Sequence, residues 1–192
     1  MVSFQERKAL RDWVALNWTG GDIVEIGAFA GASAVAILQG MEAARRPGRL
    51  YVYDTFVMPA DKAIEAIYRR LIDSNSFLEH FVENVDPWKD RVQFSVGRAE
   101  RSGVTPEHIS LLHLDCAASK GFHRDVSLRF FPRLVVGATL VQQDFDYEPA
   151  PYIKVAMKRL GEYLNTAWHI GTSRYLVVRR TISAAAIEEA FA

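Results

Sequence analysis

The sequence predicts a doubly wound α/β domain whose seven-stranded sheet is mostly parallel, with an antiparallel last strand and helices on both faces. Three runs are almost continuously apolar, as expected of parallel strands that are covered on both sides: 22–26, 109–114 and 139–142. Segments with helical spacing of apolar residues lie between them, which is the alternation that builds a parallel sheet. Two β-rich runs, Trp168 to Ile170 and Tyr175 to Arg179, surround a glycine turn and predict a closing antiparallel hairpin. Together these observations predict a Rossmann-like fold.

Length and composition indicate one domain, 1–192, without a second catalytic unit. The chain has 192 residues, and its hydrophobic content of 49% is ample for a single core. Its 23 basic and 23 acidic residues cancel to a net charge of zero, so the charge favours neither nucleic acid nor an anionic membrane surface. We therefore expect a small molecule or a protein as the partner, and a homo-oligomer stays open.

The cysteine content and the N-terminal sequence bear on the compartment. The single cysteine, Cys116, excludes an internal disulfide framework and a cysteine-based zinc cluster, which fits a reducing environment. The charged residues between Glu6 and Asp12 are unlike a signal peptide, and no apolar run approaches the length of a membrane span. We expect a cytoplasmic protein.

Several helices are expected around the sheet. Ser3 and Glu6 form a capping-box pattern at the start of an opening helix that would cover the sheet or the mouth of a ligand site. A helix from Arg124 to Phe131 is expected after a polar loop, Ala117 to His123. A further amphipathic helix, which would either form part of a substrate lid or join the core, is indicated by apolar residues at helical spacing: Ile64, Ile67, Tyr68, Leu71 and Ile72.

A small-residue turn follows the first strand, and the rest of the chain is organised around it. Its pattern is E-x-G-x-x-x-G, with Glu25 before Gly27 and Gly31, and a helix begins near Ser33. The glycines remove Cβ atoms where the backbone turns sharply and where a ligand can lie against it. The helix N-terminus offers free N–H groups, and Glu25 places a carboxylate beside them. Any domain of this fold needs such a turn, so the pattern alone leaves the ligand open.

The next two strands add polar positions at the same edge of the sheet. Leu50 to Tyr53 is expected to be a buried strand, and Asp54 at its carboxyl end is well placed to bind ribose hydroxyls. Thr55 starts the loop that leaves on the side where such sheets bind ligands. The alternating run Val92 to Val96 predicts a half-buried strand that ends at Gly97. These positions agree with the turn in predicting a ligand at this edge.

Titratable residues cluster after the fourth and fifth predicted strands. Asp115 directly follows the fourth strand, and Asp144 lies in the loop after the fifth. His113 shares the face of Asp115 by strand alternation, but a histidine inside such a strand is more typical of a hydrogen-bonded core residue. We take Asp115, Asp144 and the loop residue His123 as candidate catalytic residues. Each alone is equally well explained as a solvated loop residue, so their convergence on one edge carries the hypothesis.

The glycine turn resembles motif I of class I S-adenosylmethionine (SAM) dependent methyltransferases, in which the loop surrounds the methionine and ribose parts of SAM. The resemblance implies that residues of this edge bind the cofactor: Glu25, Gly27, Ala28, Gly31, Ser33, Asp54, Thr55, Gly97 and Asp115. Many of these enzymes carry an acid that faces the adenine amino group directly after the glycine of the third strand, and this chain has Arg98 there. Adenine recognition would then rely on backbone groups, on Glu100 or on apolar side chains.

Four segments together resemble the macrocin O-methyltransferase (TylF-like) family, over roughly Asp22 to Leu164: Val24-Glu25-Ile26-Gly27, Tyr53-Asp54-Thr55-Phe56, Leu112-His113-Leu114-Asp115 and Phe131-Pro132-Arg133-Leu134. Members methylate hydroxyl groups on sugars of antibiotics and related small molecules, commonly with magnesium. The resemblance places the metal ligands at Asp115, Gln143 and Asp144. The chain departs from the family in two ways: Cys116 to Ser119 lacks its second acid and its tyrosine, and the neutral Gln143 replaces an acid. We therefore expect weak magnesium binding or none.

The resulting hypothesis is a SAM-dependent methyltransferase that acts on a hydroxyl of a small molecule of the sugar or secondary-metabolite type. Asp115 or Asp144 would be the base or a metal ligand, with His123 as an alternate base. The alternative is a SAM-binding module with weak or no catalysis of its own, because the acidic set is incomplete. A nucleotide-linked oxidoreductase is disfavoured because G-x-G-x-x-G is absent.

Overall fold

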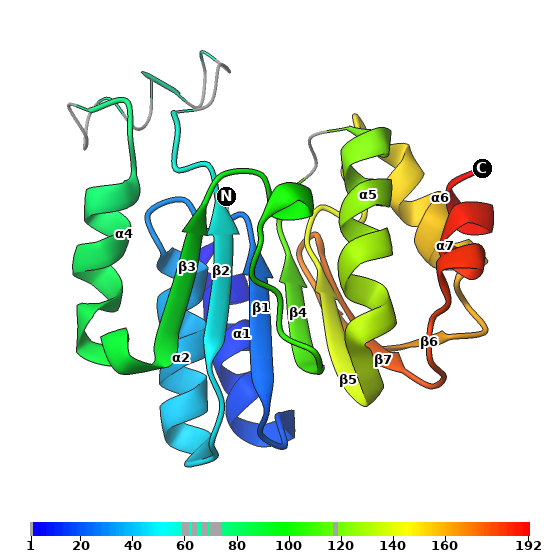
Figure 1. Cartoon of the computed structure of the whole chain (residues 1–192), viewed down its shortest axis with the longest axis horizontal. Helices are drawn as coiled ribbons and strands as arrows, with labels where there is room; N and C mark the ends of the chain where they lie inside the picture. The colour runs from blue at the N-terminus through cyan, green and yellow to red at the C-terminus, as the bar shows by residue number, and fades with distance from the viewer. Residues whose placement is uncertain (1, 59–61, 63–64, 67–68, 70–73, 117–118) are drawn as a thin grey trace.

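The computed structural model describes residues 2–58, 62, 65–66, 69, 74–116 and 119–192. Its sheet has seven strands in the order β3-β2-β1-β4-β5-β7-β6 (Figure 1). The strands are β1 (Asp22–Ile26), β2 (Leu50–Asp54), β3 (Val92–Val96), β4 (Ile109–Leu114), β5 (Leu134–Gln142), β6 (Leu164–Ile170) and β7 (Ser173–Val178). β7 runs antiparallel to its neighbours β5 and β6, whereas the pairs from β3 to β5 are parallel. The predicted sheet with its antiparallel last strand is confirmed.

Helices cover both faces of this sheet. The α-helices are α1 (Phe4–Asn17), α2 (Ala32–Ala44), α4 (Leu78–Val85), α5 (Lys120–Phe130), α6 (Pro151–Arg159) and α7 (Ala184–Phe191), with the short 3-10 helices η1 (Asp86–Arg91), η2 (Ala99–Arg101) and η3 (Phe131–Arg133). α1, α2 and α4 lie on one face and α5, α6 and α7 on the other (Figure 1). Successive residues of a strand point to opposite faces of the sheet. Ile23 accordingly belongs to the core with α1 and α2, and Val24 to the core with α5, α6 and α7. The doubly wound, Rossmann-like arrangement is confirmed.

The N-terminal helix α1 begins with the predicted capping box. The Ser3 hydroxyl accepts from the Glu6 N–H at 3.2 Å, and the Glu6 carboxylate accepts from the Ser3 N–H at 2.9 Å. Further along α1, the Trp13 indole donates to the Thr139 hydroxyl at 3.2 Å and stacks on Trp168 with ring centroids 6.2 Å apart. α1 therefore covers the sheet, with its N-terminus at the edge where the parallel strands end (Figure 1).

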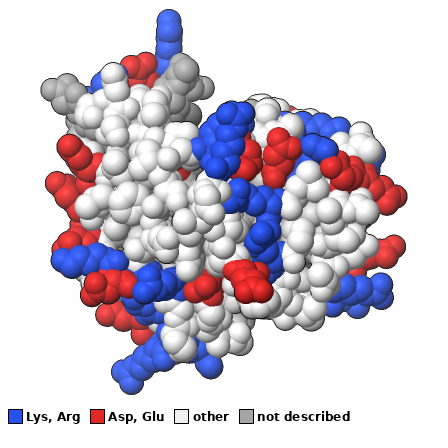
Figure 2. Space-filling view, in the orientation of Figure 1, with Lys and Arg blue, Asp and Glu red and all other residues white. Residues whose placement is uncertain are grey.

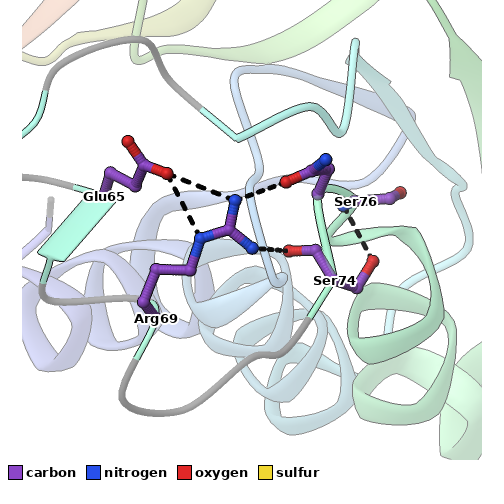
Figure 3. Close-up of polar contacts among 5 residues, drawn as sticks. Glu65, Arg69, Ser74 and Ser76 are labelled. Carbon is purple, nitrogen blue, oxygen red and sulfur yellow. Dashed lines mark hydrogen bonds and ion pairs between the residues drawn. The ribbon is translucent and has the colours of Figure 1, made fainter.

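The segment between β2 and α4 is described in part. One predicted amphipathic helix lies outside the described residues: Ile64, Ile67, Tyr68, Leu71 and Ile72. The Arg69 guanidinium pairs with the Glu65 carboxylate at 3.2 Å and donates to the Ser74 carbonyl at 3.3 Å (Figure 3). The Ser74 hydroxyl in turn accepts from the Ser76 N–H at 2.9 Å. These contacts connect the described part of the segment to the residues that lead into α4.

Charged side chains are distributed over the surface. Figure 2 shows acidic and basic residues interspersed around a broad uncharged area on the face in view. None of the helices in the described ranges has the length and apolar character needed to cross a bilayer. The single cysteine, Cys116, is a free, partly buried thiol.

Candidate functional site

The carboxyl ends of the parallel strands meet at one edge, and the backbone there is locally strained. Among the described residues, four that are not glycine have a left-handed φ. Three of them follow strands at this edge: Phe29 (φ 48°) after β1, Phe56 (φ 54°) after β2 and Asp144 (φ 57°) after β5. Side chains disfavour this conformation, and such residues concentrate where function requires a fixed geometry. The strain therefore marks this edge as the candidate site.

The two glycines of the turn after β1 are required by protein contacts. A Cβ on Gly27 (φ 88°) would lie 2.0 Å from the carbonyl oxygen of Asp115, and one on Gly31 (φ 90°) would lie 3.0 Å from the Phe81 ring of α4. Protein atoms therefore occupy the spaces that we expected a ligand to fill, namely the Asp115 carbonyl directly after β4 and the Phe81 ring of α4. Contacts of the Gly27 and Gly31 backbone with a cofactor stay predictions. Two other predicted cofactor residues, Ala28 and Ser33, have buried side chains.

Asp54, at the end of β2, holds this turn in place. Its Oδ2 accepts from the N–H groups of Ala28 at 2.7 Å and Phe29 at 2.9 Å, and its Oδ1 accepts from the Phe56 N–H at 2.6 Å. The carboxylate thus organises two strained turns, a role that the sequence did not predict. Thr55 is exposed beside it. Contacts of Asp54 and Thr55 with ribose stay predictions.

This geometry predicts that Asp54→Ala weakens SAM binding chiefly by releasing the turn. Three charge-assisted hydrogen bonds are lost, each worth about 1.5 to 3 kcal/mol, so we expect SAM affinity to fall at least about tenfold in calorimetry. The matched control is Asp22→Ala, because Asp22 accepts one backbone bond, from Arg49 at 3.2 Å, at the opposite end of β1. Equal SAM affinities of the two variants, with both folded, would contradict the prediction.

Glu25 lies in the buried core of the edge, beside His113 on the neighbouring strand. The Glu25 Oε1 and the His113 Nδ1 are 3.1 Å apart, and the two side chains are 0% and 1% exposed. Burial acts to lower the pKa of His113, but the hydrogen bond and charge of Glu25 raise it above its usual value. The second carboxylate oxygen of Glu25, Oε2, is buried without a partner. A buried acceptor without a partner calls for a donor that the described residues do not supply, such as an ordered water or a group of a bound ligand.

The corner after β3 offers a second free acceptor. Gly97 is fixed by a bond from its N–H to the Asp54 carbonyl at 2.8 Å. Arg98 turns its guanidinium to the Glu100 carboxylate and lies over the Phe122 ring, 5.1 Å from its centroid. The other oxygen of Glu100, Oε2, is buried without a partner. Of the three options for adenine recognition, this geometry favours Glu100.

Asp115 and Asp144 follow the paired ends of β4 and β5. The Asp115 N–H donates to the Ile26 carbonyl at 2.9 Å, which continues the pairing of β1 and β4. Burial raises the pKa of Asp115 to about 6; the charge of Asp144 adds to the rise, and the charge of His113 opposes it. Burial also raises the pKa of Asp144. A carboxyl whose pKa is raised to about 6, as that of Asp115 is, is suited to accept a proton near neutral pH.

The third predicted metal ligand, Gln143, does not join them. Its side chain is 2% exposed, and its Nε2 donates to the Glu6 Oε1 at 3.1 Å and to the Thr172 Oγ1 at 2.9 Å. Its Oε1 accepts from the Ser173 hydroxyl. Because both ends of the amide are used, the set Asp115, Gln143 and Asp144 does not fit a magnesium ion. Within the described ranges, His, Cys, Asp and Glu side chains form no group of three or more that could hold a metal.

His123 is not a loop base, which corrects the prediction. α5 begins at Lys120, with the Ser119 hydroxyl capping it at the Phe122 N–H, so His123 belongs to the helix; residues 117 and 118 lie outside the description. The imidazole is fully buried, and its Nε2 lies 3.1 Å from the Gln142 Oε1. Burial lowers the pKa of His123 to about 4. Since the ring is closed off from solvent, it cannot exchange a proton with a substrate.

Strand order, the glycine turn after β1 and the acid at the end of β2 define a Rossmann-like domain whose ligand edge lies at the carboxyl ends of the parallel strands. The chain belongs to the family described as "Methyltransferase domain", whose model matches residues 24–145. No curated protein matches the sequence significantly.

Solved structures with this fold include several methyltransferases. The O-methyltransferase NovP has a TM-score of 0.67 at 18% identity, over 91% of this chain and 78% of NovP. The TDP-rhamnose 3'-O-methyltransferase CalS11, of calicheamicin biosynthesis, has a TM-score of 0.61 at 17% identity, over 92% and 81% of the two chains. The SAH-bound methyltransferase PaMTH1 from Podospora anserina has a TM-score of 0.63 at 13% identity, over 94% and 80%. At these identities the similarity establishes the fold alone.

Proposed function

We propose that the protein transfers a methyl group from SAM to a hydroxyl group of a small molecule of the sugar or secondary-metabolite type. The observation that carries the cofactor assignment is the pair of buried, unpartnered carboxylate oxygens on Glu25, in β1, and on Glu100, in η2 after β3. SAM carries donors that suit both, an ammonium group and an adenine amino group. When bound, it supplies an electrophilic methyl group on a sulfonium.

The chain's own residues would position the acceptor and take its proton. Methyl transfer to oxygen is an in-line displacement, so alignment of the two reactants supplies a large part of the acceleration. Asp115 is our choice of base, because a carboxylate whose pKa is about 6 is ionised at neutral pH and basic enough to accept a hydroxyl proton. Asp144 would orient the hydroxyl beside it or share the proton.

The acceptor class rests on resemblance and on charge. The motifs shared with the TylF-like family support an acceptor hydroxyl on a sugar or related molecule. NovP and CalS11 are O-methyltransferases, and CalS11 acts on a TDP-linked sugar, which is consistent with this choice. A net charge of zero suits a small-molecule acceptor better than nucleic acid or a membrane surface. A cytoplasmic location completes the working hypothesis, and a homo-oligomer stays open.

The second candidate is a SAM-binding module with weak or no catalysis of its own. It is favoured by one observation: the Gln143 amide is engaged with Glu6 and Ser173, so the acidic set is reduced to two carboxylates. Such a module would use the same cofactor residues. The two candidates therefore differ only in turnover.

Binding and turnover measurements separate these functions. We expect calorimetry to show binding of SAM and S-adenosylhomocysteine but not of NAD. We then expect sugar-type hydroxyl acceptors to increase S-adenosylhomocysteine release from the SAM-bound protein. Binding without release for any acceptor of this type would favour the module, and absence of SAM binding would refute both.

A further inference from the structure

A buried carboxylate joins three parts of the chain at the candidate site. Glu6 of α1 is 5% exposed and lies at the N-terminus, which is placed at this edge (Figure 1). Its Oε1 accepts from the Gln143 amide at 3.1 Å and from the Thr172 N–H at 3.1 Å. It also lies 3.0 Å from the Ser173 hydroxyl, whose one proton it shares with the Gln143 Oε1. The Glu6 Oε2 also accepts from the Ser3 N–H at 2.9 Å. Because these partners donate hydrogens to it, they favour the ionised carboxylate of Glu6 over its protonated form.

The charge of Glu6 restricts which residue can occupy position 143. Gln143 donates to Glu6 with one end of its amide and accepts from Ser173 with the other. An amide offers a donor and an acceptor on one group, whereas a carboxylate offers acceptors only. An acid at position 143 would place a second negative charge against Glu6 in a buried site, which is costly. Glu6 and an acidic metal ligand at position 143 therefore exclude each other.

The same contacts fix the backbone of Asp144. Its left-handed φ of 57° is costly for a residue with a side chain. On one side, Gln143 is tied to Glu6 and to Thr172; on the other, the Phe145 N–H donates to the Thr172 carbonyl at 2.9 Å. Both neighbours of Asp144 thus bind the turn between β6 and β7, and this turn sets the direction in which Asp144 leaves β5.

We propose that the Glu6 carboxylate is the fixed anchor of this edge in place of a divalent cation, with Gln143 as the positioning residue that presents Asp144. Gln143 satisfies the charge of Glu6, and this contact removes its side chain from any metal site. The role of Asp144 toward an acceptor rests on the proposed methyltransferase function. The anchor itself is a property of the folded chain, so it can be tested without an acceptor.

The first test is thermal unfolding of the wild type and Gln143→Asp with and without millimolar magnesium chloride. We expect the melting temperature of Gln143→Asp to be about 5 to 10 °C below that of the wild type in both buffers. The melting temperature of the wild type should be the same with and without magnesium. Gln39→Asp on the exposed face of α2 is the control, with an expected change within about 2 °C. A magnesium-induced rise in the wild type or in Gln143→Asp would overturn the proposal.

The second test exchanges the two groups. Gln143→Glu alone should lower the melting temperature, because two carboxylates then face each other. The double variant Glu6→Gln with Gln143→Glu restores one carboxylate and one amide, so it should regain at least half of that loss. If the changed side-chain sizes alone caused the losses, the melting temperature of the double variant would instead fall by the sum of the two single-variant losses. Additive losses would overturn the anchor.

Kinetics and SAM binding separate this inference from the proposed function. With an acceptor that the wild type methylates, Glu6→Gln should lower kcat at least about tenfold, whereas its SAM affinity should stay within about twofold, because the anchor acts on Asp144 and not on the turn after β1. An unchanged kcat would refute the positioning role. If the wild type fails to bind SAM, the proposed function fails, and the two melting tests still decide on the anchor.

Discussion

Gly27→Ala is expected to unfold the protein or leave it only marginally stable. The added Cβ would lie 2.0 Å from the Asp115 carbonyl oxygen, a backbone atom that cannot move without breaking the pairing of β1 and β4. The overlap adds to the cost of a left-handed alanine, and together we expect a loss of about 3 to 5 kcal/mol in the free energy of unfolding. Chemical denaturation of the purified variant would measure it.

Gly21→Ala is the matched control for this variant. Gly21 has nearly the same backbone angle, φ 91° against 88°, but a Cβ there would meet Ser110 at an ordinary 3.4 Å. Gly21→Ala should lower the free energy of unfolding only by the cost of an alanine in the left-handed conformation, about 1 to 2 kcal/mol. Equal losses in the two variants would show that the Asp115 carbonyl does not restrict position 27. A loss of SAM binding in a Gly27 variant would therefore not by itself demonstrate a ligand contact.

The fold was predictable because its signals are local. The apolar runs that became β1 and β4, the glycine turn between β1 and α2, and the closing hairpin of β6 and β7 each occupy one short stretch of sequence. Side-chain alternation then assigns Ile23 and Val24 to opposite cores without knowledge of the neighbours. Boundaries were harder: α5 begins at Lys120, where the Ser119 cap decides it, and this shift moved His123 from a loop into the core.

The candidate site was predictable in position and less so in detail. Asp54, Asp115 and Asp144 follow strands that the pattern identifies, so their common edge could be predicted. The partners of Gln143 could not, because Glu6 is 137 residues away and its capping box with Ser3 already explained its presence. Hydrogen bonds between such distant residues depend on the completed sheet. Sequence pattern therefore located the carboxylates but not the contacts that use them.

Asp115→Asn is expected to abolish most turnover while stabilising the fold. If Asp115 accepts the acceptor's proton, its loss should lower S-adenosylhomocysteine release by about 10² to 10⁴, with an acceptor that the wild type methylates. The same substitution removes a carboxylate whose pKa rises from 3.8 to about 6 on folding. The full shift corresponds to about 3 kcal/mol, and because Asp115 keeps some solvent exposure we expect a gain of about 1 to 2 kcal/mol at pH 7.5.

The pH dependence of this gain identifies its cause. An acid with a raised folded pKa binds its proton more tightly in the folded state, so it destabilises the fold above about pH 6, and the penalty disappears as pH falls toward 3.8. The advantage of Asp115→Asn should therefore shrink between pH 7.5 and pH 4.5. Asp146→Asn is the control. Asp146 is an exposed acid that pairs with Lys154 at 2.7 Å and Arg174 at 2.6 Å, and these contacts lower its pKa. Asp146→Asn should therefore not raise the free energy of unfolding, and it should leave turnover unchanged. If Asp115→Asn keeps its turnover, Asp115 is not the base and Asp144 becomes the candidate. If the stability gain of Asp115→Asn does not depend on pH, the charge of the Asp115 carboxylate is not its source.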